Sequence, residues 1–383
     1  ALMAGGGVAE GLRGWRLVAA IVIGVAALAA LAAAQGLLGQ RHHQPLLALT
    51  AGPLGTRASR STASVAMLLM MLGWFAVNVG VSGTALGRLL GLPDRAGMAL
   101  MAAITLALVW GGVGRLSWAA LAAGVATVVV AAYGLSVVLD GRDVGLGGTP
   151  ESPTSVLAGA TLMVGYGAAF ALRTPDFTRD LPRARDVVAS AALGLAAPVV
   201  AFGLVGALLQ ASTGNWDLAD VLRDLGSPTA AYLFVAVGFS GSIMTNIWSG
   251  ALSLRDAWPR VGHPAAMVAV TLVGTAVAAV GFSGWMIPYL SVMALSAPPL
   301  IAVLLTHEAL GRRHGAGAAW HGPGLVAWLG GVAVGLALHA GGSALALPLG
   351  VVTASLAYGF GVRLLGGGAG RGARTGVQRR GGP

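Results

Sequence analysis

The sequence has few charged residues and contains neither cysteine nor lysine. Only 9% of its 383 residues are charged, against roughly 25% in a typical soluble domain, and 56% are hydrophobic. The lack of cysteine excludes a disulfide framework, thiol catalysis and a cysteine-ligated metal. Together with a mean hydropathy of +0.81, these figures indicate an all-α, polytopic membrane protein, because helices satisfy their own backbone polar groups in lipid.

All 23 basic residues are arginine, and the formal net charge is +10. Such a charge can indicate nucleic-acid binding, but these arginines lie in short loops between apolar runs, so we expect no nucleic-acid partner. An apolar run of about 20 residues is long enough to cross the hydrocarbon core of a bilayer. The sequence contains eleven such runs, at 15–35, 63–88, 97–113, 116–139, 154–173, 187–210, 229–253, 264–282, 284–306, 323–341 and 344–365.

The loops between these runs alternate in charge. One set holds seventeen of the twenty-three arginines, including those of the tail at 368–383, and the other holds eight of the thirteen acidic residues. Since arginine-rich loops stay in the cytoplasm, we expect a multi-pass protein of the cell membrane with a disordered, basic, cytoplasmic C-terminal tail.

The start of the chain does not fit this topology by itself. Eleven spans with a cytoplasmic C-terminus place Ala1 outside the cell, and the chain opens directly with an apolar, glycine-rich stretch. We therefore expect residues 1–14 to be the outer half of a first helix that is truncated in this sequence. The intact protein would then have twelve spans.

Two glycine clusters lie inside apolar stretches of the sequence. Gly165-Tyr166-Gly167 lies within 154–173, and Gly5-Gly6-Gly7 lies near the start. Because glycine weakens a helix by about 1 kcal/mol relative to alanine, we interpret both clusters as helix breaks that line a site. The alternative is close helix packing through small residues.

The two clusters open two similar units. The units cover 1–139 and 153–306, each has five helices, and the second is therefore inverted relative to the first. With the additional helices of 323–365, they form one transporter domain, 1–367.

Several segments resemble the nucleobase–cation symporter family. They are ASRSTASVAMLLMMLGWFAVNVGV (58–81), TPDFTRD (174–180), NIWSGALSLRD (246–256) and LSAPPLIAVLLTHEALGRR (295–313). Within this family, the chain resembles cytosine permease and the hydroxymethylpyrimidine transporters. The chain departs from the family at Asp180, where an aromatic residue is usual, and at His307-Glu308, where Asp-Tyr is usual. The resemblance implies the LeuT-type fold, with helices 1 and 6 broken and the substrate between them and helices 3, 8 and 10.

The third helix offers two candidate substrate contacts. Trp74 and Asn78 are four residues apart, so they share one face of the helix. An indole can stack on a heterocycle, and an amide can both donate to and accept from its edge. The alternative is a packing tryptophan with an amide that cross-links helices. The resemblance implies that both residues contact substrate.

The other candidates lie on the sixth and eighth helices. At Gly165, Tyr166 and Gly167 the freed backbone could bind a neutral heterocycle, and Asn246 is a further candidate. The resemblance implies a sodium site that uses hydroxyls of the eighth helix. We expect those of Ser240, Ser242 and Thr245, although such hydroxyls often bond only to their own helix.

The apolar runs have no Asp, Glu, Lys or Arg well inside a span. A proton-coupled carrier usually needs such a group, whereas hydroxyls and carbonyls suit a hard cation, so Na⁺ is favoured over H⁺ as coupling ion. The sequence shows no metal-ligand spacing, and we expect no other cofactor. Asp176 and Arg179 are interpreted as loop residues that are solvated or form gating ion pairs, because they flank an arginine-rich loop.

These features predict a monomeric secondary transporter, and not an enzyme. It would be a cation-coupled symporter in the lipid bilayer that imports a nucleobase or related flat heterocycle by alternating access. The alternatives are an amino-acid-type permease of the same fold and a non-transporting membrane enzyme or scaffold. An enzyme would need a buried acid–base or metal constellation, which the sequence does not show, and substrate uptake would separate a carrier from a scaffold.

Overall fold

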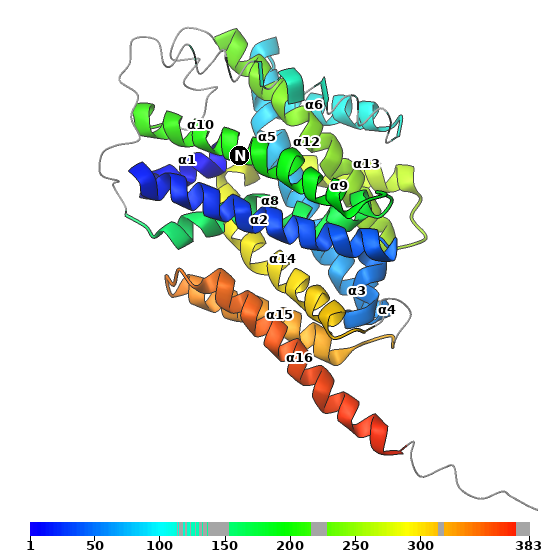
Figure 1. Ribbon diagram of the computed structural model, residues 1–383. Helices are drawn as coiled ribbons and strands as arrows, with labels where there is room; N and C mark the ends of the chain where they lie inside the picture. Colours follow the sequence, from blue (N-terminus) through cyan, green and yellow to red (C-terminus); the bar gives the residue numbers. More distant parts are fainter. Residues whose placement is uncertain are drawn as a thin grey trace, which may run out of the picture.

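A computed structural model describes residues 1–112, 153–215, 228–312 and 318–372, with isolated positions between 114 and 136. In these ranges the regular structure is helical (Figure 1). The first unit contains α1 (Leu2–Gly11), α2 (Gly14–His42), α3 (Leu46–Leu54), α4 (Thr56–Ala58), the π-helix η1 (Ser59–Ala63), α5 (Ser64–Leu90) and α6 (Asp94–Val109). The second contains α8 (Val156–Thr178), α9 (Ala184–Ala189), the π-helix η2 (Ser190–Ala196), α10 (Ala197–Thr213), α12 (Pro228–Ala257), α13 (His263–Ala279), the 3₁₀-helix η3 (Phe282–Trp285) and α14 (Met286–Ala309), and it is followed by α15 (Gly322–Ala340) and α16 (Ala346–Gly372).

Eight of the eleven expected spans coincide with helices that are long and apolar enough to cross a membrane. The runs at 264–282 and 97–113 correspond to the shorter helices α13, with 17 residues, and α6, with 16. The run at 116–139 lies largely outside the described residues, as do the loops that follow it. Helix α16 continues to Gly372, past the predicted end of the domain at 367, and residues 373–383 of the predicted tail are outside the described ranges.

The helix ends follow local sequence signals. The Ser155 hydroxyl caps α8 by accepting from the backbone N–H of Ala158 at 3.1 Å, which satisfies one of the donors that a helix start leaves unpaired. Gly91 follows the last residue of α5 and Gly214 follows the last residue of α10, and both have the left-handed backbone that glycine adopts without strain.

The two units pack with a reciprocal pattern. The first helix of each unit lies against the second helix of the other, since α1 packs on α10 and α8 packs on α2. The third helices, α5 and α12, pack on each other, and each also packs on the fourth helix of both units, α6 and α13. This reciprocity is what two inverted copies of one five-helix unit would produce.

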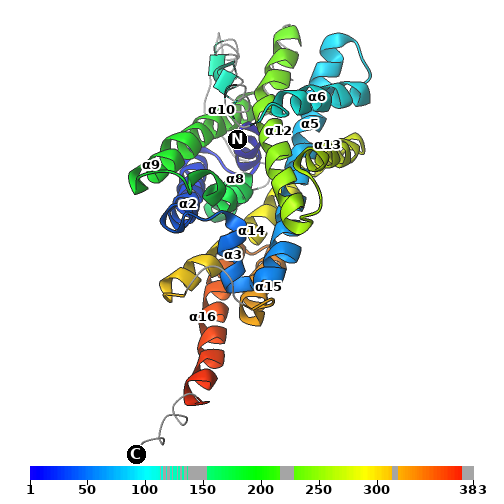
Figure 2. The same cartoon turned by 90° about the vertical axis from the view of Figure 1, so that its right-hand side faces the viewer.

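The helices form two groups. Helices α1, α2, α8 and the α9–η2–α10 segment make the α2–α8 group, and helices α5, α6, α12 and α13 make the α5–α12 group. Figure 2 shows the two groups side by side, with α14 between them. Helices α15 and α16 pack on each other and on α14, at the edge of the structure (Figure 1).

The glycine clusters do not break their helices, and the sequence-based interpretation is wrong on this point. Helix α8 runs without interruption through Gly165, Tyr166 and Gly167, and α1 runs through Gly5. A methyl group on Gly165 would lie 2.1 Å from the Leu290 carbonyl oxygen of α14. One on Gly5 would lie 1.9 Å from the carbonyl oxygen of Gly203 in α10. These glycines let neighbouring backbones approach closely, which is the packing alternative.

Candidate functional site

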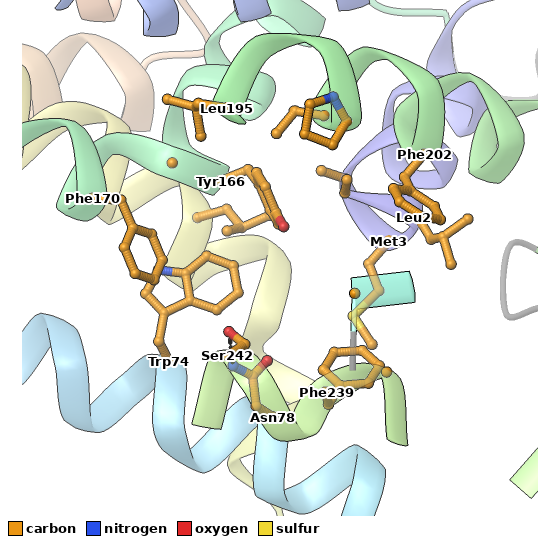
Figure 3. Close-up of a pocket in the computed structure, with 18 of the residues that line it drawn as sticks. Leu2, Met3, Trp74, Asn78, Tyr166, Phe170, Leu195, Phe202, Phe239 and Ser242 are labelled. Carbon is orange, nitrogen blue, oxygen red and sulfur yellow. Dashed lines mark hydrogen bonds between the residues drawn. The ribbon is translucent and has the colours of Figure 1, made fainter. Parts of the chain in front are cut away.

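A cavity of about 390 Å³ lies between the two helix groups. Its walls come from α1, α5, α8, η2, α10, α12 and α14 (Figure 3). Small-molecule sites in proteins have volumes of roughly 300–1,000 Å³ and are mostly apolar with a few polar groups. The lining fits that description, because most of it is aliphatic or aromatic and its polar side chains are concentrated on α5, α8 and α12.

Trp74 lies at the centre of an aromatic cluster on one side of the cavity. Its ring lies edge-to-face with Tyr166 of α8, at 5.5 Å between centroids, and with Tyr289 of α14, at 5.7 Å. The Tyr289 hydroxyl donates to the Met70 carbonyl of α5, one turn before Trp74. The indole of α5 is therefore packed against α8 and α14, although no hydrogen-bond partner for its buried Nε1 is present among the described residues.

Asn78 and Ser242 form the polar side of the cavity. The Asn78 side-chain amide donates from Nδ2 to the Ser242 hydroxyl at 2.8 Å (Figure 3), which joins α5 to α12. Because Nδ2 makes this bond, the Asn78 Oδ1 is the amide atom left to accept from a ligand, and the Ser242 hydroxyl can still donate. One acceptor and one donor side by side match the edge of a nucleobase-like ring.

Five of the predicted site residues line this cavity, and they are Trp74, Asn78, Tyr166, Gly167 and Ser242. The spacing of Trp74 and Asn78 correctly placed both on one face of α5. Gly167 also packs against the Leu28 side chain of α2.

Gly165 and Asn246 are not part of the lining. Gly165 faces the α14 backbone at Leu290. Asn246 lies one helical turn beyond Ser242 on α12 and is fully buried, with no hydrogen-bond partner for either amide atom among the described residues.

The predicted cation ligands do not form one cluster. The Ser240 hydroxyl donates to the Val237 carbonyl at 2.7 Å, and the Thr245 hydroxyl donates to the Gly241 carbonyl at 2.9 Å. Both bonds stay within α12, as serine and threonine hydroxyls often do in apolar helices. At about 100° per residue, Ser240 and Ser242 point in nearly opposite directions, and only Ser242 reaches the cavity.

Sequence reasoning missed four phenylalanines of the lining, Phe170, Phe202, Phe234 and Phe239. Phe170 was detectable, because it follows Tyr166 by four residues and so shares its face of α8. Phe202 and Phe234 carry no local signal, since their position depends on how α10 and α12 pack.

The π-helix η2 was also missed, and it contributes Leu195 to the cavity wall. Pro198 follows η2 and lacks a backbone N–H. The missing donor disturbs the regular hydrogen-bond ladder at this point, and π-helical turns of this kind are frequent at functional sites.

The described lining contains no Asp, Glu, His, Lys or Arg side chain. Within the described ranges, no three His, Cys, Asp or Glu side chains lie close enough to hold a metal ion. The chemistry that this site offers is therefore recognition by stacking, hydrogen bonding and apolar contact.

Comparison with known proteins gives a family and a fold. Residues 1–316 match the family described as permeases for cytosine/purines, uracil, thiamine and allantoin. No curated protein matches the chain at a significant level.

Solved structures share the architecture. The transporter Mhp1, of the nucleobase-cation-symport-1 family, superposes in a closed conformation with bromovinylhydantoin bound, with a TM-score of 0.82, 20% identity, and 96% of this chain and 89% of that chain covered. Its inward-facing conformation also gives a TM-score of 0.82, with 18% identity and coverage of 96% and 87%. A Na⁺-coupled sialic acid symporter in a substrate-bound, outward-open state gives 0.67, with 14% identity and coverage of 95% and 87%. The LeuT-type fold predicted from the sequence is thereby confirmed.

Proposed function

Because the chain belongs to the family of permeases for cytosine, purines, uracil, thiamine and allantoin, we propose that it is a cation-coupled symporter that carries a nucleobase or a related flat heterocycle. The observation that carries this proposal is the cavity between the two helix groups, where the Trp74 indole lies beside the Asn78–Ser242 pair. An aromatic surface favours a flat ring, and the paired donor and acceptor read the polar edge of that ring.

Two features support alternating access as the mechanism. The cavity lies at the junction of two helix groups that are each densely packed internally, so one group can move against the other without disrupting either core. Mhp1, which has this fold, is known in both a closed and an inward-facing conformation. We infer that this chain changes between such states with the heterocycle in the cavity.

Sodium is the coupling ion that the chain favours. A proton-coupled carrier usually needs a titratable side chain near its substrate, and the described lining has no Asp, Glu, His, Lys or Arg side chain. Hydroxyl and backbone oxygens are suitable ligands for a hard cation, and α12 carries several of them within one apolar span. Sodium coupling is stated in the name of the structurally similar sialic acid symporter.

A binding panel tests the proposal directly. Purified protein would be titrated with cytosine, uracil, adenine, a hydroxymethylpyrimidine and a hydantoin, with leucine as the ligand of an amino-acid-type permease. Stacking on an aromatic side chain is worth about 1–3 kcal/mol per base, so Trp74→Ala should weaken heterocycle binding by roughly tenfold to a hundredfold. Asn78→Leu should instead reduce discrimination among the heterocycles, because unpaired polar groups are what reject wrong ligands.

Trp110→Ala is the matched control. Trp110 is a half-exposed tryptophan at the end of α6, outside the cavity, and its loss should leave affinity and selectivity unchanged. Wild-type affinity and selectivity in folded Trp74→Ala and Asn78→Leu would refute the assignment of this cavity. Binding of leucine but no heterocycle would favour the amino-acid-type alternative.

A further inference from the structure

Helix α12 carries a polar face that leads away from the cavity. Ser242, Asn246, Ser249 and Ser253 follow one another at intervals of four, three and four residues, which places them within an arc of about 60° on the helix. Contacts fix the direction of this face at both ends. Ser242 lines the cavity, and Ser253 accepts a hydrogen bond from Arg173 of α8. Asn246 and Ser249 therefore face the seam where the two helix groups meet.

The middle of this face is buried and polar. Asn246 is 0% exposed and Ser249 is 1% exposed, and no hydrogen-bond partner for the Asn246 amide or the Ser249 hydroxyl is present among the described residues. Proteins rarely leave buried polar atoms unpaired. Two apolar residues in their place would pack this seam at lower cost, so these side chains indicate a conformation in which the seam opens to water or to a polar ligand.

Helix α8 presents a matching series across the seam. Tyr166, Phe170 and Arg173 follow at intervals of four and three residues and also share one face. Tyr166 and Phe170 line the cavity. Arg173 lies one turn further and is buried, with 3% exposure.

Arg173 is anchored on its own side of the seam. Its Nε lies 2.9 Å from a carboxylate oxygen of Asp176, on the same helix. The other Asp176 oxygen accepts from the Leu46 backbone N–H, at the start of α3, at 2.9 Å. From this anchored position Arg173 donates to the Ser253 hydroxyl. Within the described residues, this is the hydrogen bond between side chains that joins α8 to α12.

We propose that the seam between α8 and α12 is one half of the substrate's route, and that Arg173 closes it through its hydrogen bond to Ser253. When the helix groups separate at this end, the Arg173–Asp176 pair moves with α8 and Ser253 moves with α12. Asn246 and Ser249 then face the opened seam and hydrogen-bond the departing heterocycle or water. The substrate named here rests on the proposed function, whereas the closure itself does not.

The absence of cysteine from the chain permits a direct test by thiol labelling. In a Ser249→Cys protein, the new thiol should react slowly with a water-soluble maleimide, because the site is closed. Adding Ser253→Ala removes the acceptor of the Arg173 bond and leaves the Arg173–Asp176 pair intact. We expect the labelling rate of Cys at 249 to rise by about tenfold, the factor that about 1.4 kcal/mol corresponds to. Arg173→Gln should have the same effect, because it removes the guanidinium that donates this bond and leaves a shorter side chain.

Ala251→Cys is the matched control. Ala251 is fully buried on the same helix, but it lies on the opposite face, in the cluster that α12 forms with α5 and α13. Its labelling rate should not change on adding Ser253→Ala or Arg173→Gln. An unchanged rate at position 249 in both backgrounds would overturn the proposal. An equal increase in the labelling rates of Ser249→Cys and Ala251→Cys would also overturn it, because that result would indicate general loosening of α12.

Heterocycle binding is measured on the same proteins to separate the two proposals. If the labelling rate at position 249 rises and no heterocycle binds, the proposed closure is supported and the proposed substrate is wrong. If a heterocycle binds and the labelling rate at position 249 does not change in the Ser253→Ala or Arg173→Gln background, the proposed function is supported and the proposed closure is wrong. Should Arg173→Gln fail to fold, Ser253→Ala alone decides, since it deletes a single buried hydroxyl.

Discussion

Replacing Ser242 with alanine tests how the cavity recognises its ligand. Sequence reasoning assigned Ser242 to a cation site and Asn78 to the substrate, whereas the structure joins the two by a hydrogen bond of 2.8 Å. This bond fixes which way the Asn78 amide faces, so that Oδ1 is left to accept from the ligand. Without the Ser242 hydroxyl the amide can turn over and present a donor in place of an acceptor.

The expected effect is that of one neutral hydrogen bond. Such a bond contributes about 0.5–1.5 kcal/mol net, so Ser242→Ala should weaken heterocycle binding by roughly two- to tenfold. Asn78→Leu removes the same bond from the other side. The double variant should therefore lose less affinity than the sum of the two single variants, with a coupling energy of roughly 0.5–1.5 kcal/mol.

Isothermal titration calorimetry on purified protein, at several fixed sodium concentrations, measures this coupling. Thr105→Val is the control, because Thr105 is a buried hydroxyl of α6 that bonds within its own helix, outside the cavity. If Ser242 positions Asn78, the loss of affinity persists at saturating sodium. Losses that add within about 0.3 kcal/mol, and that vanish at saturating sodium, would refute this reasoning and return Ser242 to the cation site.

Two further predictions concern packing and coupling. Gly165→Ala should lower the melting temperature and the folded yield, because the new methyl group would lie 2.1 Å from the Leu290 carbonyl oxygen and overpacking costs about 1–3 kcal/mol. Gly330→Ala is the control, because a methyl group there would have no atom within 4 Å, and it should leave the melting temperature unchanged. Equal melting temperatures for the two variants would contradict the packing role of Gly165. Uptake into proteoliposomes should require a sodium gradient. Uptake that continues without sodium and stops with an uncoupler would indicate proton coupling.

The spans and their order could be predicted because the bilayer restricts what a sequence can do. A run of apolar residues such as 284–306 has few alternatives to a membrane helix, and η3 together with α14 forms one there. The same-face placement of Trp74 and Asn78 follows from helical spacing alone. In each case the signal is local and needs no knowledge of neighbouring helices.

The glycine clusters could not be interpreted correctly from the local sequence. A glycine pair inside an apolar helix is compatible both with a break that lines a site and with close contact between helices. What decides between them is whether another backbone lies against the glycine. For Gly165 that backbone is at Leu290, 125 positions further along the chain, and nothing near Gly165 in the sequence records it.

The Asn78–Ser242 pair is beyond sequence reasoning for the same reason. The two residues are 164 positions apart, and four polar side chains lie close together on α12 between Ser240 and Asn246. Which of these hydroxyls reaches the cavity depends on the rotation of α12 against α5. That rotation is fixed by the packing of apolar side chains such as Phe75 and Ile247, and not by any property of the hydroxyls.

The position of the charges around Arg173 explains how the proposed closure could open reversibly. The sequence placed it at the end of a span, beside an arginine-rich loop, but the structure buries it between helices. An isolated buried charge would be very costly, so an arginine that is buried while the seam is closed needs a charged partner. Asp176 is that partner, and it lies on the same helix as Arg173. Opening therefore exchanges a single hydrogen bond to Ser253 for a bond to water and leaves the ion pair intact, a change small enough to be reversed in every transport cycle.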